Sequence, residues 1–258
     1  MRDLNAQRLF VDAPLGEARE IALGSDQANY LLNVLRLGDG GDILVFNGSD
    51  GEWLARVRRD GKRGCTLILQ QLTRSQEAGP DIHYLFAPLK RSRLDYMVQK
   101  ATELGAARLS PVITRRTIAE RVNVERMRAN VIEAAEQCGI LRVPDVAEPV
   151  KLERAIADWP NRQQTAGRWL VFCDEGAAIS NPIEALARVS ARPGLKSSST
   201  PPIAVLIGPE GGFDPTEREM LLRQPFTIAI SLGPRIMRAD TAAVAALALV
   251  NATCGDWR

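Results

Sequence analysis

Two glycine-proline segments near the C-terminus constrain this chain more than any other feature. The first, Ile207-Gly-Pro-Glu-Gly-Gly-Phe-Asp214, follows an apolar run and precedes a polar helix pattern. The second, Ser231-Leu-Gly-Pro-Arg-Ile-Met-Arg-Ala-Asp-Thr241, follows another short apolar run and precedes an alanine-rich helix pattern. Two units of strand, glycine-rich turn and helix place two loops at the carboxyl ends of neighbouring strands, where open α/β sheets bind ligands.

These loops suit contact between a ligand and the main chain. Gly211 and Gly212 lack a Cβ, and the free N–H groups of the following helix favour an anion or a carboxylate. The first segment lacks the lysine that a nucleotide-binding P-loop requires. Its glycine spacing also differs from the dinucleotide-binding fingerprint, so neither kind of site is expected. The alternative is two ordinary turns that use glycine for tightness.

The chain from residue 81 alternates strand and helix patterns, which predicts a mostly parallel sheet with helices on both faces. The expected strands are 83–87, 108–114, 168–173, 203–207 and 227–232. The expected helices are 89–104, 123–138, 151–158, 181–189, 214–223 and 238–253. The low-complexity stretch 190–202 is expected to be a surface loop.

Residues 1 to about 75 predict a small β-rich module. Short strand patterns at 8–11, 42–46, 52–58 and 65–72 are separated by turns rich in glycine, asparagine and aspartate. One helix interrupts them, with Ser25 as its expected cap and Ala28, Leu31, Leu32 and Leu35 as its apolar face. The polar segment 74–80 ends in Gly-Pro and is the expected linker.

Composition favours an ordinary globular protein, with 45% hydrophobic and 25% charged residues among 258. No apolar run approaches a membrane span, and the N-terminus lacks a secretory signal pattern. The four cysteines are widely spaced and are expected to be buried, reduced thiols of a cytosolic protein. The single histidine, His83, opens a strand pattern and is interpreted as structural, so no metal site is expected.

Positive charge concentrates in one part of the chain. Between residues 83 and 130, ten basic residues face four acidic ones, although the net charge of the whole chain is only +2. This distribution is typical of contact with a phosphate backbone, with a solvated helix face as the alternative. The residues expected to bind RNA are Lys90, Arg91, Arg93, Arg115 and Arg116.

The glycine-proline segments resemble those of the RsmE family of 16S ribosomal RNA uridine-N3 methyltransferases, in the SPOUT superfamily. Upstream segments match in the same order: Arg8-Leu-Phe-Val11, Lys100-Ala-Thr-Glu-Leu-Gly105, Glu133-Ala-Ala-Glu-Gln-Cys-Gly139 and Arg142-Val-Pro144. The resemblance covers essentially the whole chain. Two departures are Ile140, where the family usually has arginine, and Ala239-Asp240, where Thr-Glu is more usual.

The resemblance implies a PUA-like β-barrel that binds RNA at 1–75 and a SPOUT methyltransferase domain with a C-terminal trefoil knot at 76–258. It implies a cytoplasmic enzyme that methylates N3 of one uridine in the decoding region of 16S ribosomal RNA, either free or in the small ribosomal subunit. S-adenosylmethionine (SAM) is the implied cofactor. The nearly all-round apolar pattern of the last helix, together with the resemblance, predicts a homodimer; burial within the same chain is the alternative.

The expected site residues follow from the matched motifs. The expected cofactor contacts are Phe172, Asp174, Ile207, Gly208, Glu210, Gly211, Gly212, Leu232, Gly233, Ile236 and Met237. Arg235 and Arg238 are candidates for stabilising a uracil anion or gripping phosphate, and Glu210 is the nearest candidate base, with cofactor binding or helix capping as alternatives. Arg8 joins the expected RNA contacts.

Two other functions compete with this prediction. A related SPOUT enzyme would methylate a ribose 2′-OH or guanine N1. A non-catalytic RNA-binding assembly factor would use the β-rich module and the basic residues alone, but two intact glycine loops argue against it because RNA binding needs no cofactor pocket.

Overall fold

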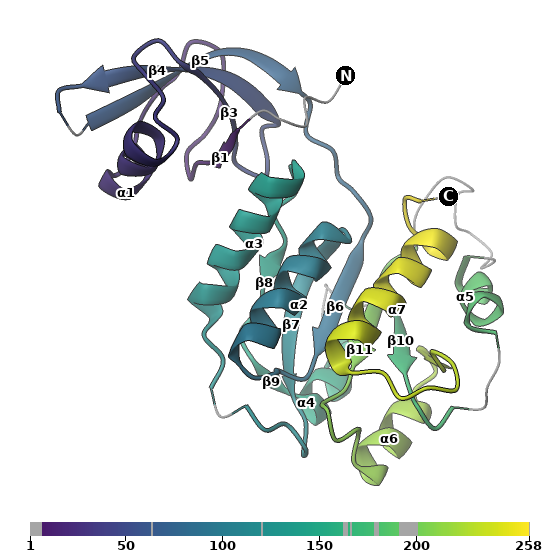
Figure 1. The fold of residues 1–258 in the computed structure, drawn as a ribbon. Coiled ribbons are helices and arrows are strands. Elements are labelled where there is room, and N and C mark those ends of the chain that lie inside the picture. Colours follow the sequence, from purple (N-terminus) through teal and green to yellow (C-terminus); the bar gives the residue numbers. More distant parts are fainter. Residues whose placement is uncertain are drawn as a thin grey trace. The chain divides into compact units, whose positions relative to one another are not determined.

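The computed structural model describes residues 7–62, 64–119, 121–161, 165, 167–177, 181–190 and 201–257, without the side chains of Arg91 and Ser190. The chain divides into two compact units (Figure 1). The first unit contains Met1–Ala78 together with Ile132–Val143, and the second contains Gly79–Val131 together with Pro144–Arg258. The segment 191–200, in the predicted surface loop, lies outside the described residues.

The first unit is built on a five-stranded sheet. Its strands are β1 (Arg8–Phe10), β2 (Glu20–Ala22), β3 (Asp42–Phe46), β4 (Glu52–Asp60) and β5 (Gly64–Arg74). Their order is β1-β3-β4-β5-β2, and only the β1–β3 pair is parallel. The four predicted strands are confirmed, whereas β2, which pairs with the distant strand β5, was not predicted.

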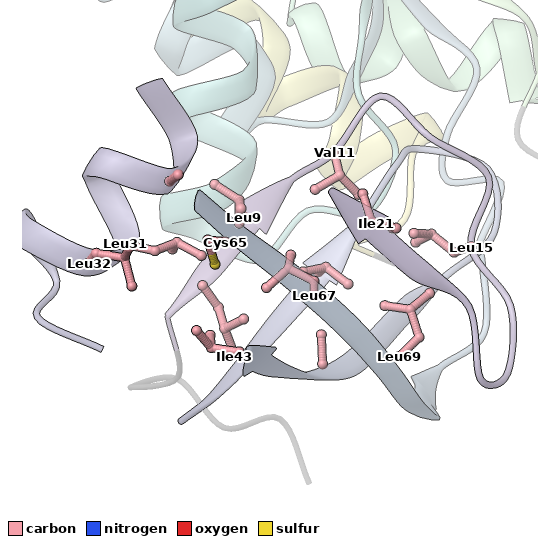
Figure 2. Packing of buried hydrophobic residues seen from close by; sticks show 14 residues of the cluster. Leu9, Val11, Leu15, Ile21, Leu31, Leu32, Ile43, Cys65, Leu67 and Leu69 are labelled. Atoms are coloured by element: carbon pink, nitrogen blue, oxygen red, sulfur yellow. The ribbon is translucent and has the colours of Figure 1, made fainter. Parts of the chain in front are cut away.

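One helical segment packs on this sheet. The helix α1 (Ser25–Asn29) continues into a π-helical turn, η1 (Tyr30–Val34). The expected cap at Ser25 is wrong: Gly24 is the N-cap, and the Ser25 hydroxyl donates to Asp26 Oδ1 instead of accepting a backbone N–H. The predicted apolar face is confirmed, because Ala28, Leu31 and Leu32 are buried in the core that Figure 2 shows.

The first unit is completed by a segment distant in sequence, Ile132–Val143. Ala135 and Leu141 pack against Phe46, and Glu136 Oε1 accepts a hydrogen bond from the backbone N–H of Phe10 at 2.8 Å. Burial raises the pKa of Glu136 above its ordinary value. The helix α3 (Val124–Cys138) therefore contributes its first turns to one unit and its last turns to the other.

The second unit is an α/β structure around a parallel sheet. Its strands are β6 (Ile82–Phe86), β7 (Ala106–Ile113), β8 (Asp145–Val146), β9 (Val150–Lys151), β10 (Trp169–Cys173), β11 (Ile203–Ile207) and β12 (Thr227–Ile230). The order is β12-β10-β11-β6-β7-β8, with β9 beside β7, and every pair is parallel. The predicted parallel sheet is confirmed, and β8 and β9 are two-residue strands that the sequence pattern did not reveal.

Helices cover this sheet. They are α2 (Arg91–Glu103), α3, α4 (Leu152–Ala157), the 3-10 turn η2 (Trp159–Asn161), α5 (Pro182–Ser190), α6 (Pro215–Leu222) and α7 (Ala239–Cys254). Alternate strand residues pack in opposite directions. Leu85, Leu170 and Phe172 join α4 and α6 in one core cluster, whereas the neighbouring Tyr84 donates from its hydroxyl to Met97 of α2.

The last helix, α7, is covered by its own chain on more than one side. It packs against α2, α5 and β11, and Figure 1 shows it between α2 and α5. Ala243, Leu247 and Val250 are buried, while Thr241 and Ala252 are exposed. Burial within the chain thus accounts for most of the apolar pattern of α7.

The trefoil knot stays a prediction.

Candidate functional site

A cavity of about 540 Å³ lies at the carboxyl ends of three adjacent strands of the second unit, β11, β10 and β12. Its walls come from three segments, 173–176 after β10, 207–213 after β11 and 231–239 after β12. The two glycine-proline loops therefore flank the end of β10, because β10 lies between β11 and β12 in the sheet. The volume is within the usual range for small-molecule sites.

The first glycine loop is shaped by its own phenylalanine. A Cβ at Gly208 would lie 2.5 Å from Phe213 Cε2, so the Phe213 ring occupies the space that any other residue would need. The ring makes an edge-to-face contact with Phe172, with centroids 5.0 Å apart. Gly212 has a φ of +69°, which favours glycine, whereas Gly211 has a negative φ and no close neighbour. Gly208 is therefore required for packing within the loop.

The loop ends in a capped helix. Asp214 is the N-cap of α6 and forms a capping box with Glu217, whose side chain accepts from the Asp214 N–H at 3.2 Å. Hydrogen bonds from Thr216 hold the pKa of Asp214 below its ordinary value. Asp214 thus fixes the exit of the loop.

The second glycine loop offers main chain and apolar side chains. Gly233 has a φ of +107° and no atom within 4 Å of a Cβ built there. Leu232 and Met237 are partly buried at the cavity, and Ile236 also lines it although the residue is 96% exposed. Arg235 and Arg238 are exposed beside them. This wall therefore presents cationic and apolar groups together.

The third wall is held by an ion pair that the sequence analysis missed. Asp174 is buried, and both of its oxygens accept from Arg218 Nε at 3.0 Å. Arg218 Nη2 also donates to the carbonyl of Gly176 at 3.0 Å. Because Arg218 belongs to α6, one guanidinium joins the end of β10 to the helix that follows the first loop. No local sequence pattern marks this pair, because Arg218 and Asp174 are 44 residues apart.

Three of the predicted RNA contacts, Arg93, Arg115 and Arg116, also touch the first glycine loop or the start of α6. Arg93 of α2 pairs with Glu210, and both side chains line the cavity. Arg116 Nη1 donates to the carbonyl of Gly211 at 2.7 Å, and Arg115 Nη1 donates to Asp214 Oδ1 at 3.1 Å. All three arginine side chains keep exposed surface. These three arginines and the first glycine loop therefore form one contact network.

Most of the predicted site residues come together at this cavity, with exceptions. Phe172 is fully buried beneath Phe213, and Gly211 does not line the cavity. Lys90 is exposed next to α2, and the side chain of Arg91 lies outside the described residues. Arg8 is placed elsewhere: its side chain is 4% exposed and its Nε pairs with Glu52 at 3.0 Å within the first unit, so it is unavailable to a phosphate.

The cysteines differ in environment. Cys65 and Cys254 are buried as expected, but Cys138, at the end of α3, is exposed, so its predicted burial is wrong. Cys173 keeps some exposed surface at the cavity, and desolvation of its thiol raises its pKa to about 12. His83 is buried in β6 and lies 3.5 Å from Asp81 Oδ1. Among the described residues, no three or more histidine, cysteine, aspartate or glutamate side chains are grouped so that they could hold a metal ion.

Comparison with known protein families defines the class of this fold and site. A model of the RNA methyltransferase domain matches residues 76–251, and a model of the RNA methyltransferase PUA domain matches residues 23–70. The chain therefore has the domains of an RNA methyltransferase with an N-terminal PUA domain. Of the described helices, none is long and apolar enough to cross a membrane.

Full-length relatives narrow the class. The chain is 32% identical over 245 residues to ribosomal RNA small subunit methyltransferase E of Rickettsia conorii, covering 95% of this chain and 94% of that one. The Bacillus subtilis protein of the same name is 26% identical over 95% of this chain and 96% of its own. The chain belongs to the ribosomal RNA small subunit methyltransferase E family, which confirms the resemblance seen in its motifs.

Solved structures agree with this assignment. The crystal structure of a ribosomal RNA small subunit methyltransferase E from Neisseria gonorrhoeae, bound to S-adenosyl methionine, is 25% identical, with a TM-score of 0.80 over 98% of this chain and 100% of that one. A Legionella pneumophila methyltransferase in complex with SAM is 25% identical, with a TM-score of 0.79 over 96% of this chain and 98% of that one. The predicted fold, apart from the knot, is confirmed.

Proposed function

We propose that this protein transfers a methyl group from SAM to N3 of a uridine in the decoding region of 16S ribosomal RNA, in the cytoplasm. The observation that carries the proposal is the cavity itself: two glycine-proline loops and a third strand end converge at one edge of a parallel sheet, in a member of this family. SAM, when bound, supplies an electrophilic methyl group.

The residues at the cavity fit such a cofactor. SAM carries a sulfonium, an ammonium and a carboxylate group, and the cavity is lined by both acidic and basic side chains. The acidic ones are Asp174, Glu175 and Glu210, and the basic ones are Arg93, Arg218, Arg235 and Arg238. Apolar side chains of the two glycine loops suit the adenine and the methylene groups of the methionine arm, and exposed main chain suits the amino-acid end. We propose that Asp174, Ile207, Gly208, Gly212, Leu232, Gly233, Ile236 and Met237 hold it, while Phe172 acts only beneath the loop, by supporting Phe213.

The reaction requires the N3 proton of uracil to leave as the methyl group arrives. Histidine is not the base, because the only histidine, His83, is buried in β6 away from the cavity walls. We propose that Glu210 accepts this proton, and that Arg235 and Arg238 stabilise the negative charge that develops on the uracil oxygens. Their exposed positions on the second loop support this role.

Substitution of Glu210 distinguishes a role as general base from a role in binding the cofactor. In Glu210→Gln, a lower methylation rate at saturating SAM, with a changed pH dependence, identifies the base. A rate that recovers fully at saturating SAM identifies a cofactor contact instead. Glu219→Gln, on the exposed face of α6, is the matched control and leaves both values unchanged.

Nucleoside mass spectrometry of small-subunit ribosomal RNA after reaction with SAM tests the proposed product. We expect N3-methyluridine. A 2′-O-methylated nucleoside or 1-methylguanosine would assign one of the related activities instead. Calorimetry that detects no SAM binding would favour the non-catalytic assembly factor.

We further propose that residues 1–75 act as the RNA-binding module and 76–258 as the catalytic domain, and that the protein is a homodimer. The partly exposed apolar side chains of Val244 and Leu249 on α7, and the exposed Ile236, support a subunit contact. Light scattering is expected to return about twice the chain mass of 28.2 kDa, and a monomer mass would contradict the dimer.

A further inference from the structure

The ion pair between Arg93 and Glu210, beside the first glycine loop, is a contact that a phosphate can break. Arg93 and Glu210 form an ion pair at the cavity with side chains that are 38% and 45% exposed. An exposed pair of this kind is held weakly, because water screens both charges. Its guanidinium can therefore be taken by a competing anion.

A phosphodiester can compete for this guanidinium. Arginine donates two parallel N–H bonds to a phosphate as it does to a carboxylate, so a phosphate can replace Glu210 as the partner of Arg93. Arg93 belongs to a stretch of the sequence with ten basic and four acidic residues, several of whose basic side chains pair with carboxylates, among them Arg108 with Asp145 and Arg126 with Asp95. Arg116 is exposed beside the same loop and donates to the carbonyl of Gly211, so its positive charge adds to the attraction for a nucleic-acid backbone. RNA that binds there reaches Arg93 beside the cavity.

The rest of the loop has attachments that do not involve Arg93. Arg116 donates to the carbonyl of Gly211, and Asp214 accepts from the Arg115 side chain. The backbone N–H of Arg115 donates to Glu217, a carboxylate that is only 1% exposed. These contacts hold the chain at Gly211, Asp214 and Glu217, just after Glu210. Glu210 therefore stays at the cavity when Arg93 turns away.

We propose that the Arg93–Glu210 pair couples RNA binding to cofactor binding: a phosphate of the RNA takes Arg93, and the Glu210 carboxylate, no longer neutralised, strengthens the attraction of the cavity for the cationic cofactor. The inference rests on the proposed function, because it takes SAM and RNA as the two ligands. Beyond the proposed function, it states that the coupling is positive: each ligand raises the affinity of the protein for the other by the same factor.

The charge of the cofactor gives the test its selectivity. SAM carries a sulfonium charge, whereas S-adenosylhomocysteine (SAH) has the same adenosine and amino-acid groups around a neutral sulfur. A carboxylate that loses its arginine partner attracts SAM more than SAH, while a general loosening of the loop weakens both. The ratio of the two affinities therefore separates an electrostatic effect from a structural one.

The experiment is calorimetric titration of the full-length protein with SAM and with SAH at low ionic strength, with and without a short oligouridylate as the phosphate probe. Arg93→Gln removes the pair, and Glu210→Gln removes the carboxylate. Arg128→Gln is the matched control, because Arg128 is also a partly exposed arginine paired with a glutamate, Glu125, in the same unit. Thermal unfolding checks that each variant is folded.

We expect Arg93→Gln to raise the association constant for SAM by about two- to fivefold, the range that an exposed ion pair allows, and to leave that for SAH nearly unchanged. The oligouridylate should have the same effect on the unmodified protein and none on Arg93→Gln. Glu210→Gln should lose the preference for SAM, and Arg128→Gln should behave as the unmodified protein.

Equal changes for SAM and SAH in Arg93→Gln would overturn the proposal, as would an oligouridylate that leaves SAM affinity unchanged or lowers it in the unmodified protein. An unmodified protein that binds no SAM would instead overturn the proposed function, and this inference with it.

Discussion

Replacing Gly208 by alanine should damage the first glycine loop through a contact inside the loop, without any ligand. The new Cβ would lie 2.5, 2.9 and 3.0 Å from three carbons of the Phe213 ring, so the ring must leave its place. It would then lose its edge-to-face contact with Phe172, a kind of pair worth about 0.5–1.5 kcal/mol beyond buried area. Overpacking usually costs about 1–3 kcal/mol in total, which is the destabilisation expected here.

Gly211→Ala is the matched control, three residues along the same loop. Its Cβ would meet only Arg116 Cδ at 3.8 Å, an ordinary contact, and its φ is outside the left-handed region. We expect a change of less than about 0.5 kcal/mol, as for a surface position.

Chemical denaturation of both variants, with SAM titration of the folded proteins, measures the difference. Gly208→Ala should unfold at lower denaturant concentration and bind SAM more weakly, and Gly208→Ala/Phe213→Leu should recover part of the stability because the smaller side chain makes room. Equal destabilisation of Gly208→Ala and Gly211→Ala would refute the reasoning. So would a double variant that recovers nothing.

Gly212→Val should abolish SAM binding with a native circular dichroism spectrum, because a β-branched residue is strained at a φ of +69°; unchanged affinity in calorimetry would remove the loop from the site. Replacing Arg115 and Arg116 by glutamine should make the dependence of RNA affinity on salt shallower by about 0.7 per lost phosphate contact, measured by fluorescence anisotropy. Iodoacetamide at pH 8 should modify Cys138 and spare Cys173, whose pKa is about 12; mass spectrometry that finds Cys173 alkylated first would contradict the burial argument.

The sequence predicted the parts of this fold that depend on local pattern. The apolar runs before the two glycine loops are strands β11 and β12, and the strand predicted before 173 is β10 between them, because buried parallel strands are nearly continuous apolar runs. The strands β2, β8 and β9 were not predicted, because their pairing depends on residues that are distant in the sequence.

The candidate site was predicted unevenly for a related reason. A glycine-rich loop can be recognised from the sequence, but the residue with which each arginine pairs cannot. Arg8 and Arg93 are equally basic in the sequence, yet one is buried against Glu52 and the other pairs with Glu210 at the cavity. Arg218 went unnoticed because its partner, Asp174, is 44 residues away.

The division of α3 between the two units affects how the protein folds during its synthesis. The first unit needs Ile132–Val143 to bury Phe46 and to pair the backbone of Phe10, but this segment is made more than fifty residues after Ala78. At about 5–20 residues per second, the nascent first unit waits roughly 3–10 s with that surface uncovered. During this interval Phe46 lacks its apolar partners Ala135 and Leu141, and a chain truncated before residue 132 cannot complete the core of the first unit.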